Sequence, residues 1–195
     1  MAKQSWKPGN MLYPVPAVLV TCQDKQGNDN VLTVAWAGTV CSDPAMLSIS
    51  VRKERYSYHM IKESGEFVVN LTTEALMRAT DYCGVRSGRD EDKFKAMGLT
   101  KGSAREVKAP VIMESPVNIE CRVKQVLELG SHDLFIAEVV NVQISEEYMD
   151  EKGSFHLNEA DLLAYSHGEY YKLGKKLGTF GCSVRKPAHK KKRNA

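Results

Sequence analysis

The strongest chemical signal in the sequence is a group of cationic and hydroxyl side chains in residues 48–58. This segment reads Ser-Ile-Ser-Val-Arg-Lys-Glu-Arg-Tyr-Ser-Tyr and lies where a strand is expected to pass into a helix. A phosphate dianion is bound by the same combination of positive charge, hydroxyl donors and N–H groups at a helix N-terminus. The alternative is a solvated, charged first turn. Cations at this end of a helix oppose the helix dipole, so a nearby anion would explain them.

A second unusual segment, residues 30–38, combines one tryptophan with several small residues and ends in glycine. It reads Asn-Val-Leu-Thr-Val-Ala-Trp-Ala-Gly. Small residues allow a flat ligand to approach the backbone, whose free N–H and C=O groups can bind the edge of a ring. The alternative is a core strand in which Trp36 fills the mouth of a barrel.

Two further features become important only if they lie near these segments. Residues 86–94 form a polar loop and a helix start, and Lys93 would matter if this loop closes over a ligand. His132 opens a long strand beside Asp133, where a neutral imidazole could hydrogen-bond or stack beside a ligand, or lie at the surface. The remaining histidines and the five scattered cysteines lack metal-ligand spacing, so we expect no metal. No nucleophile-elbow motif supports a hydrolase triad.

The composition is that of an ordinary single domain. The chain has 195 residues, of which 43% are hydrophobic and 26% charged, and a net charge of +3. The basic run at 189–193 contains no aromatic side chain that could stack on bases, so we expect no nucleic-acid partner. The sequence contains no signal peptide and no apolar run of about 18 residues. We therefore expect a cytoplasmic protein with reduced thiols and no membrane contact.

The periodicity predicts short strands, a few helices and one long hairpin. Helices are expected over 53–64, from Thr72 or Thr73, and over about 90–97, with Gly65 and Gly98 as stops. A bulge is expected near Gln125 in the hairpin. The expected strands are 15–21, 31–40, 46–51, 67–71, 117–123 and 134–143.

These elements favour a mainly β protein, a barrel with peripheral helices, within one domain at residues 1–186. The strands and helices do not alternate regularly and no Gly-x-Gly-x-x-Gly motif follows a strand, which argues against a dinucleotide-binding fold. The segment 187–195 is rich in Lys and Arg, so we expect a basic, disordered tail there.

Taken in order, five segments resemble the flavin reductase-like family, and most of all its flavoredoxin branch. They are residues 30–38, 41–44 (Cys-Ser-Asp-Pro), 48–61, 92–94 (Asp-Lys-Phe) and 130–135 (Gly-Ser-His-Asp-Leu-Phe). The resemblance covers about residues 10–182. It implies an FMN-binding split β-barrel, normally a homodimer with the flavin near the subunit interface.

The resemblance also implies which residues contact FMN. Asn30 and Trp36 would lie along the ribityl chain and the ring, and the main chain of residues 33–35 would meet the edge of the isoalloxazine. Ser57 would bind the phosphate, where relatives often have threonine. Tyr165 would lie against the ring. The full set is Asn30, Thr33, Val34, Ala35, Trp36, Ser50, Val51, Arg52, Ser57, Lys93, His132 and Tyr165.

Three functions are consistent with this resemblance. The first is an electron carrier or reductase with tightly held FMN, which exchanges electrons with a redox protein or with NAD(P)H. The second is an NAD(P)H:flavin oxidoreductase that uses flavin as a substrate, although a bulky Trp36 or Tyr165 over the ring would hinder nicotinamide stacking. The third is a non-enzymatic flavin-binding module. Because the flavin would carry the redox chemistry, we expect no essential catalytic acid or base.

Overall fold

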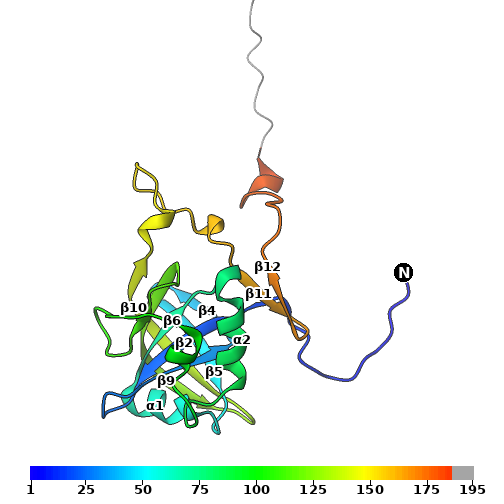
Figure 1. Cartoon of the computed structure of the whole chain (residues 1–195). Coiled ribbons are helices and arrows are strands. Elements are labelled where there is room, and N and C mark those ends of the chain that lie inside the picture. Colours follow the sequence, from blue (N-terminus) through cyan, green and yellow to red (C-terminus); the bar gives the residue numbers. More distant parts are fainter. Residues whose placement is uncertain (186–195) are drawn as a thin grey trace, which may run out of the picture.

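The central element of the computed structural model is one antiparallel sheet whose strands wrap around a core (Figure 1). The structure describes residues 1–185, so the predicted basic tail at 187–195 lies outside the described residues. The order of strands across the sheet is β3-β2-β6-β9-β10-β5-β4. Their bounds are β2 (Val18–Gln23), β3 (Asp29–Val34), β4 (Ala37–Ser42), β5 (Ala45–Val51), β6 (Glu66–Asn70), β9 (Val117–Glu128) and β10 (Asp133–Ile144).

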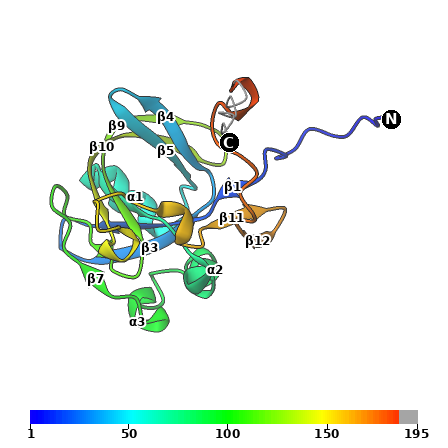
Figure 2. The same cartoon turned by 90° about the horizontal axis from the view of Figure 1, so that it is seen from above.

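The sheet closes into a barrel because its two edge strands follow each other in the chain. Only Ala35 and Trp36 separate β3 from β4, and such a link spans at most about 11 Å. Figure 2 shows the strands as a ring around the interior. The expected mainly β barrel is therefore confirmed. The expectation of one strand over residues 31–40 is wrong, because β-branched and small residues continue through the break and conceal it.

The long hairpin of β9 and β10 bends around the barrel through irregular pairing. Val123 pairs with Ala137 and Gln125 with Ile136, so Lys124 has no direct partner in the register. An extra residue of this kind bends a strand and increases its twist. The bulge expected near Gln125 is confirmed, one residue earlier in the chain.

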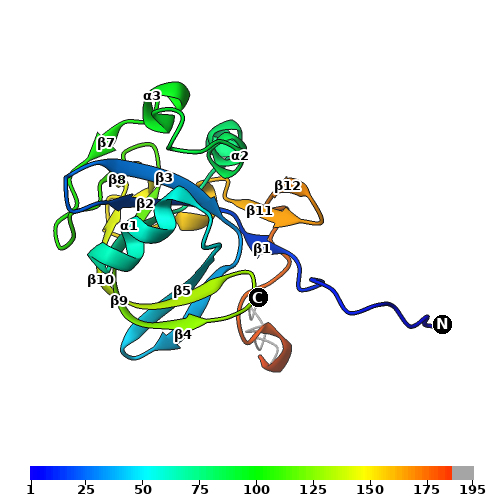
Figure 3. The ribbon, with the colours of Figure 1, turned by 90° about the horizontal axis from the view of Figure 1, so that it is seen from below.

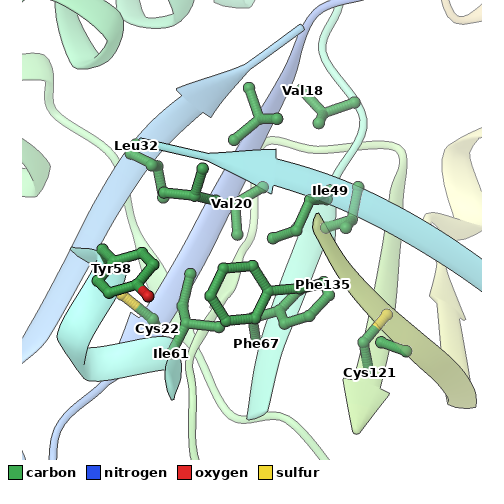
Figure 4. Close-up of a cluster of buried hydrophobic side chains, with 14 of the residues drawn as sticks. Val18, Val20, Cys22, Leu32, Ile49, Tyr58, Ile61, Phe67, Cys121 and Phe135 are labelled. Atoms are coloured by element: carbon green, nitrogen blue, oxygen red, sulfur yellow. The ribbon is translucent and has the colours of Figure 1, made fainter. Parts of the chain in front are cut away.

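The barrel interior is filled by alternating side chains of the strands and is closed at one end by α1 (Tyr56–Ser64). Phe67 and Phe135 lie at its centre, with Tyr58 and Ile61 of α1 packed against the same cluster (Figure 4). Full burial of each such side chain stabilises the fold by roughly 1.5–3 kcal/mol. α1 ends at the predicted Gly65, whose φ is 70°. It begins three residues later than predicted, because residues 52–55 form a turn.

The outer face of β2 and β3 is covered by α2 (Met77–Val85) and α3 (Lys93–Met97), as Figure 3 shows. A short 3-10 helix, Glu74–Leu76, precedes α2. α3 begins at residue 93 rather than 90, because the Asp92 carboxylate accepts hydrogen bonds from the N–H groups of Phe94 and Lys95. It ends at the predicted Gly98. This cap places Lys93 in the first turn of α3.

A smaller sheet of β1 (Val15–Pro16), β11 (Leu163–Ser166) and β12 (Glu169–Lys172) lies beside the barrel. Residues 1–12 lead into it and residues 173–185 leave it, and both segments stand away from the barrel in Figures 1 and 3. Within residues 1–185, no helix has the length and apolar character needed to cross a membrane. The remaining elements are β7 (Lys101–Gly102), β8 (Val111–Ile112) and 3-10 helices at Glu146–Tyr148, Leu157–Glu159 and Cys182–Val184.

Candidate functional site

Two neighbouring hollows lie where β3, α1 and the loop after α2 meet. The smaller has a volume of about 180 Å³ and is named the basic cavity, because most of its charged side chains are cationic. The chain brings it together from β3, the start of α1, the end of α2 with the loop at 86–89, and the start of α3. Its lining residues are Asn30, Leu32, Glu54, Arg55, Tyr56, Ser57, Cys83, Arg86, Ser87, Gly88, Arg89 and Lys93.

The floor of the basic cavity is a buried pair of polar side chains. The Asn30 amide donates to Ser57 Oγ at 2.6 Å, which joins β3 to the first turn of α1. That turn contains no acidic residue, and its N-cap residue, Arg55, makes no side-chain cap hydrogen bond. The first N–H groups of a helix have no partner inside the helix. The start of α1 therefore offers donors and a partial positive charge to the cavity.

Lys93 is buried in this cavity with only 3% of its surface exposed. Its Nζ donates to the carbonyl oxygens of Cys83 (3.2 Å) and Arg86 (3.3 Å). None of the ion pairs within residues 1–185 involves Lys93. Burial lowers the pKa of the Lys93 ammonium, since a cation away from water is unfavourable without a counter-charge. An anion bound in the cavity would remove this penalty.

The loop at 86–89 closes over β3 only because it contains glycine at the point of contact. A Cβ atom on Gly88 would lie 2.2 Å from Asn30 Oδ1, a distance that no real side chain occupies. Any other residue here would force the loop away from Asn30. The close approach keeps the cavity narrow and its polar groups convergent.

The larger hollow has a volume of about 510 Å³ and is named the aromatic cleft. Arg55 lines both hollows, so the two lie on either side of or around the same side chain. Trp36 comes from the link between the sheet edges, while Tyr165 and Tyr170 come from β11 and β12, with ring centroids 5.5 Å apart. Its lining residues are Asn10, Ala17, Thr33, Ala35, Trp36, Arg52, Arg55, Asp81, Gly84, Val85, Ser131, His132, Tyr165, Gly168 and Tyr170.

Two titratable groups of the aromatic cleft have shifted pKa values. Burial and then the positive charge of Arg52 lower the pKa of His132 below its ordinary value, so the imidazole is neutral at pH 7. Its Nδ1 lies 2.8 Å from Ser131 Oγ. Burial, with the Asp81 carboxylate as a further cause, raises the pKa of Tyr170 to about 12. The cleft therefore presents the neutral groups of His132 and Tyr170 beside the cations Arg52 and Arg55 and the carboxylate of Asp81.

The structure distributes most of the predicted site residues between the two hollows. Asn30, Ser57 and Lys93 line the basic cavity, whereas Thr33, Ala35, Trp36, Arg52, His132 and Tyr165 line the aromatic cleft. Val34 and Val51 line neither, because their side chains lie in the barrel core. Ser50 also lines neither, and its N–H donates to the Trp36 carbonyl at 2.8 Å. Contacts from Val34 and Val51 to a ligand would have to come from the main chain.

Several lining residues were not predicted from the sequence. Arg55 belongs to the cationic segment 48–58, so its charge was a usable signal. Arg86 and Arg89 lie in a loop whose closure over Asn30 cannot be seen in the sequence. Tyr170 carries no local signal, because only the pairing of β11 with β12 brings it beside Tyr165.

Comparison with known proteins agrees with this architecture. A flavoredoxin from Desulfovibrio vulgaris (Miyazaki F) is 33% identical, with a TM-score of 0.87 over 94% of this chain and 100% of that one. A flavoredoxin from Methanosarcina acetivorans is 29% identical, with a TM-score of 0.84 over 93% and 97% of the two chains. An uncharacterized protein of Archaeoglobus fulgidus is 34% identical over 72% of this chain and 78% of its own.

The barrel type and the family follow from two further matches. A flavin reductase with a split-barrel domain from Shewanella frigidimarina is 25% identical, with a TM-score of 0.76 over 85% of each chain. The family model for the flavin reductase like domain matches residues 10–174. This range includes every lining residue of both hollows. The chain therefore belongs to the flavin reductase-like family, and its barrel is a split barrel.

Proposed function

We propose that this protein binds FMN non-covalently and uses it to transfer electrons. In this proposal the basic cavity holds the phosphate and the aromatic cleft holds the isoalloxazine ring. The observation that carries it is Lys93, a buried cation whose partners are two neutral carbonyl oxygens. A phosphate dianion in the same cavity would supply the missing counter-charge.

The donor set of the basic cavity fits a phosphate group. It combines Lys93, the hydroxyl of Ser57, the N-terminus of α1 and the guanidinium groups of the loop at 86–89. The two hollows are adjacent at Arg55, so in this proposal one elongated ligand, charged at one end and flat at the other, occupies both. Together they fall within the range of roughly 300–1,000 Å³ that is usual for small-molecule sites.

The comparisons support the same choice of ligand. The two flavoredoxins share the fold of the whole chain and about a third of its residues. A protein from Thermus thermophilus that is described as FMN-binding has the same fold, with a TM-score of 0.75 at 22% identity. These names support FMN over other phosphorylated aromatic ligands.

When bound, FMN supplies the redox chemistry. The residues of the chain bind it, orient it and control its surroundings. Lys93 and Ser57 anchor the phosphate end, while Trp36 and Tyr165 keep water from the aromatic end. Arg52 and Arg55 stabilise negative charge in the cleft by their proximity. His132 is neutral at pH 7, so it can either donate or accept a hydrogen bond there.

We further propose a cytoplasmic homodimer that receives electrons from a redox protein or from NAD(P)H. The family resemblance supports the dimer, and the aromatic cleft is open enough for a second molecule to reach it. The bulky Trp36 and Tyr165 in the cleft favour a protein donor over a stacked nicotinamide.

Titration of the protein with FMN and with riboflavin, followed by flavin fluorescence, tests the binding site. Riboflavin lacks the phosphate but keeps the ring. We expect FMN to bind at least tenfold more tightly, because only FMN gives Lys93 a counter-charge. Equal affinities for the two ligands would contradict the assignment of the basic cavity to phosphate.

Anaerobic absorbance spectra of the FMN-loaded protein test the electron source. We expect the flavin bands to persist with NADH or NADPH and to bleach with dithionite, as in a carrier that is reduced by another protein. Rapid bleaching by NADPH or NADH would instead identify a nucleotide-dependent reductase.

A further inference from the structure

Asp133, the first residue of β10, is a carboxylate that lines neither hollow. Its side chain is fully buried, and the Tyr58 hydroxyl donates to its Oδ2 at 2.6 Å. Among residues 1–185, its Oδ1 is the one buried side-chain polar atom without a hydrogen-bond partner, and Lys53 Nζ lies 3.3 Å from it. The hydrogen bond from Tyr58 and the charge of Lys53 lower the pKa of Asp133 against the effect of burial. Asp133 is therefore a fixed negative charge inside the protein.

Tyr58 and Lys53 link Asp133 to the start of α1 and to the turn that precedes it. One helical turn after Tyr58, Lys62 Nζ donates to the Tyr58 hydroxyl at 3.1 Å. Lys62 and Lys53 also lie 3.5 and 4.0 Å from the Glu128 carboxylate at the end of β9. The side chains of Lys53, Tyr58, Lys62, Glu128 and Asp133 are named the Asp133 network. The network joins the turn, α1 and both strands of the long hairpin.

The Asp133 network adjoins the aromatic cleft through the chain itself. Arg52 and Arg55, which line the cleft, flank Lys53 in the turn. His132, which also lines the cleft, directly precedes Asp133. In the sheet, Asp133 pairs with the last residue of β5, so the turn begins beside it. The attraction between Lys53 and Asp133 therefore sets how the two guanidinium groups lie relative to the imidazole.

Stability alone does not account for a charge at this position. An ion pair away from water gains little over apolar side chains of the same volume. The surroundings of Tyr58 would suit such side chains, since the Phe135 ring centroid lies 5.7 Å from its own. A buried pair adds fixed geometry, because a charge that moves away leaves its partner unpaired.

Glu120 of β9 is the other fully buried carboxylate in residues 1–185, and its partners differ. It accepts hydrogen bonds from the N–H groups of Arg105 and Glu106 and from the side-chain amides of Asn141 and Gln143. None of these residues lines the basic cavity or the aromatic cleft. Glu120 therefore anchors a loop to the hairpin and adjoins no part of the candidate site.

We propose that Asp133 is a positioning residue of the flavin site. Through Lys53 and Tyr58 it holds the turn before α1 against the start of β10. This contact places Arg52 and His132 at the aromatic cleft. The inference rests on the proposed function for the identity of the ligand, whereas the arrangement of these side chains is measurable in protein that contains no flavin.

The pKa of His132 in the flavin-free protein reports this arrangement. Burial and then Arg52 lower it, Glu54 raises it and Arg55 lowers it further. In Asp133→Asn the turn is no longer held, so we expect the pKa of His132 to rise toward its ordinary value of 6.5. Loss of a neighbouring negative charge would by itself lower this pKa, so the two explanations predict opposite signs. Titration by proton NMR measures it, with His132→Gln identifying the imidazole signal.

The double variant Lys53→Met with Asp133→Asn decides the question if the single variant does not fold. It removes one positive and one negative charge, so the net charge is unchanged and no buried charge is left unpaired. We expect the pKa of His132 to rise here as well, because the turn has lost its anchor. A pKa that stays at the wild-type value or falls in the double variant would overturn the inference.

Glu120→Gln is the matched control, since it also removes a fully buried negative charge. We expect lower resistance to urea in this variant but an unchanged pKa of His132, because Glu120 adjoins neither hollow. A rise as large as that in the double variant would mean that general loosening of the barrel moves the imidazole, and would overturn the role of Asp133.

FMN titrations of the same proteins separate this inference from the proposed function. We expect the double variant to bind FMN about two- to fivefold less tightly, the effect of displacing a partly exposed charge. If the wild type fails to bind FMN while the pKa of His132 still rises in the double variant, the proposed function fails and the positioning role in the cleft stands. Equal FMN affinities of the wild type and the double variant would overturn that role at the flavin site.

Discussion

The basic cavity and the aromatic cleft meet at Arg55, but the chain builds them in different ways. In the cavity, Asn30, Ser57 and Lys93 are buried and hydrogen-bonded to groups of other segments. In the cleft, Trp36 and Tyr165 are half-buried and come from a two-residue link and a small side sheet. A cavity with fixed donors suits tight recognition of one charged group. A cleft with half-exposed walls suits a ring that must remain accessible to a redox partner.

The largest expected effect separates the two hollows directly. Replacing Lys93 by methionine removes the buried charge and should weaken FMN binding by roughly 1.5–3 kcal/mol, which is about 10- to 150-fold. Riboflavin affinity should not fall, because riboflavin has no phosphate. Lys95→Met is the control, since Lys95 is exposed on the same helix. Parallel losses for both ligands would show that Lys93 supports the cleft as well as the cavity.

The next effect comes from the shape of the cavity. Gly88→Ala places a Cβ atom against Asn30 Oδ1, so the loop at 86–89 must move outward. Overpacking of this kind costs roughly 1–3 kcal/mol, and we expect it to appear mainly as lost FMN affinity. Gly130→Ala is the control, because a Cβ there meets nothing within 4 Å. An unchanged FMN affinity in Gly88→Ala would mean that the loop does not shape the phosphate site.

A smaller effect is expected in the cleft. Trp36→Leu removes an aromatic face, and a stacked aromatic pair contributes about 0.5–1.5 kcal/mol beyond its buried area. FMN and riboflavin should both bind slightly less tightly, and the absorbance and fluorescence of the bound flavin should change. Tyr171→Leu, in β12 but outside the lining of the cleft, is the control. An unaltered flavin spectrum in Trp36→Leu removes this residue from the site.

The smallest effect concerns pH. Burial and the positive charges of Arg52 and Arg55 keep the pKa of His132 below 6.5, against the opposing effect of Glu54. The unfolded chain therefore binds the proton of His132 more readily, and stability falls as the pH drops below 6.5. Urea unfolding at pH 7.5 and 5.5 should show a smaller loss in His132→Gln than in the wild type. A larger loss in the variant would mean that the pKa of His132 is raised in the folded protein.

Much of the architecture could be predicted because its signals are local. Gly65 and Gly98 end α1 and α3 as expected, since a left-handed residue that closes a helix favours glycine. The long hairpin and its bulge were visible in the alternation of β9 and β10. The limits of helices were less certain, because Asp92 and the turn at 52–55 act through hydrogen bonds rather than through periodicity.

The site was only partly predictable. The chemical types of the basic cavity, cations and hydroxyls near a helix start, are plain in residues 48–58. The sequence does not show which of these residues line one cavity, because the lining also requires the loop at 86–89 to close over Asn30. The break between β3 and β4 was hidden in a continuous run of strand-forming residues. That break is what exposes Trp36 to the cleft.

The sequence by itself determined the mainly β class, the helix ends, the hairpin and the cation-rich segment, because these depend on residues close together in the chain. Only the tertiary structure decided that Asn30 meets Ser57, that Lys93 is buried beside them and that Trp36 and Tyr165 line the same cleft. The physical reason is closure of the barrel. It joins the two sheet edges through a two-residue link and converts separate polar segments into one enclosed site.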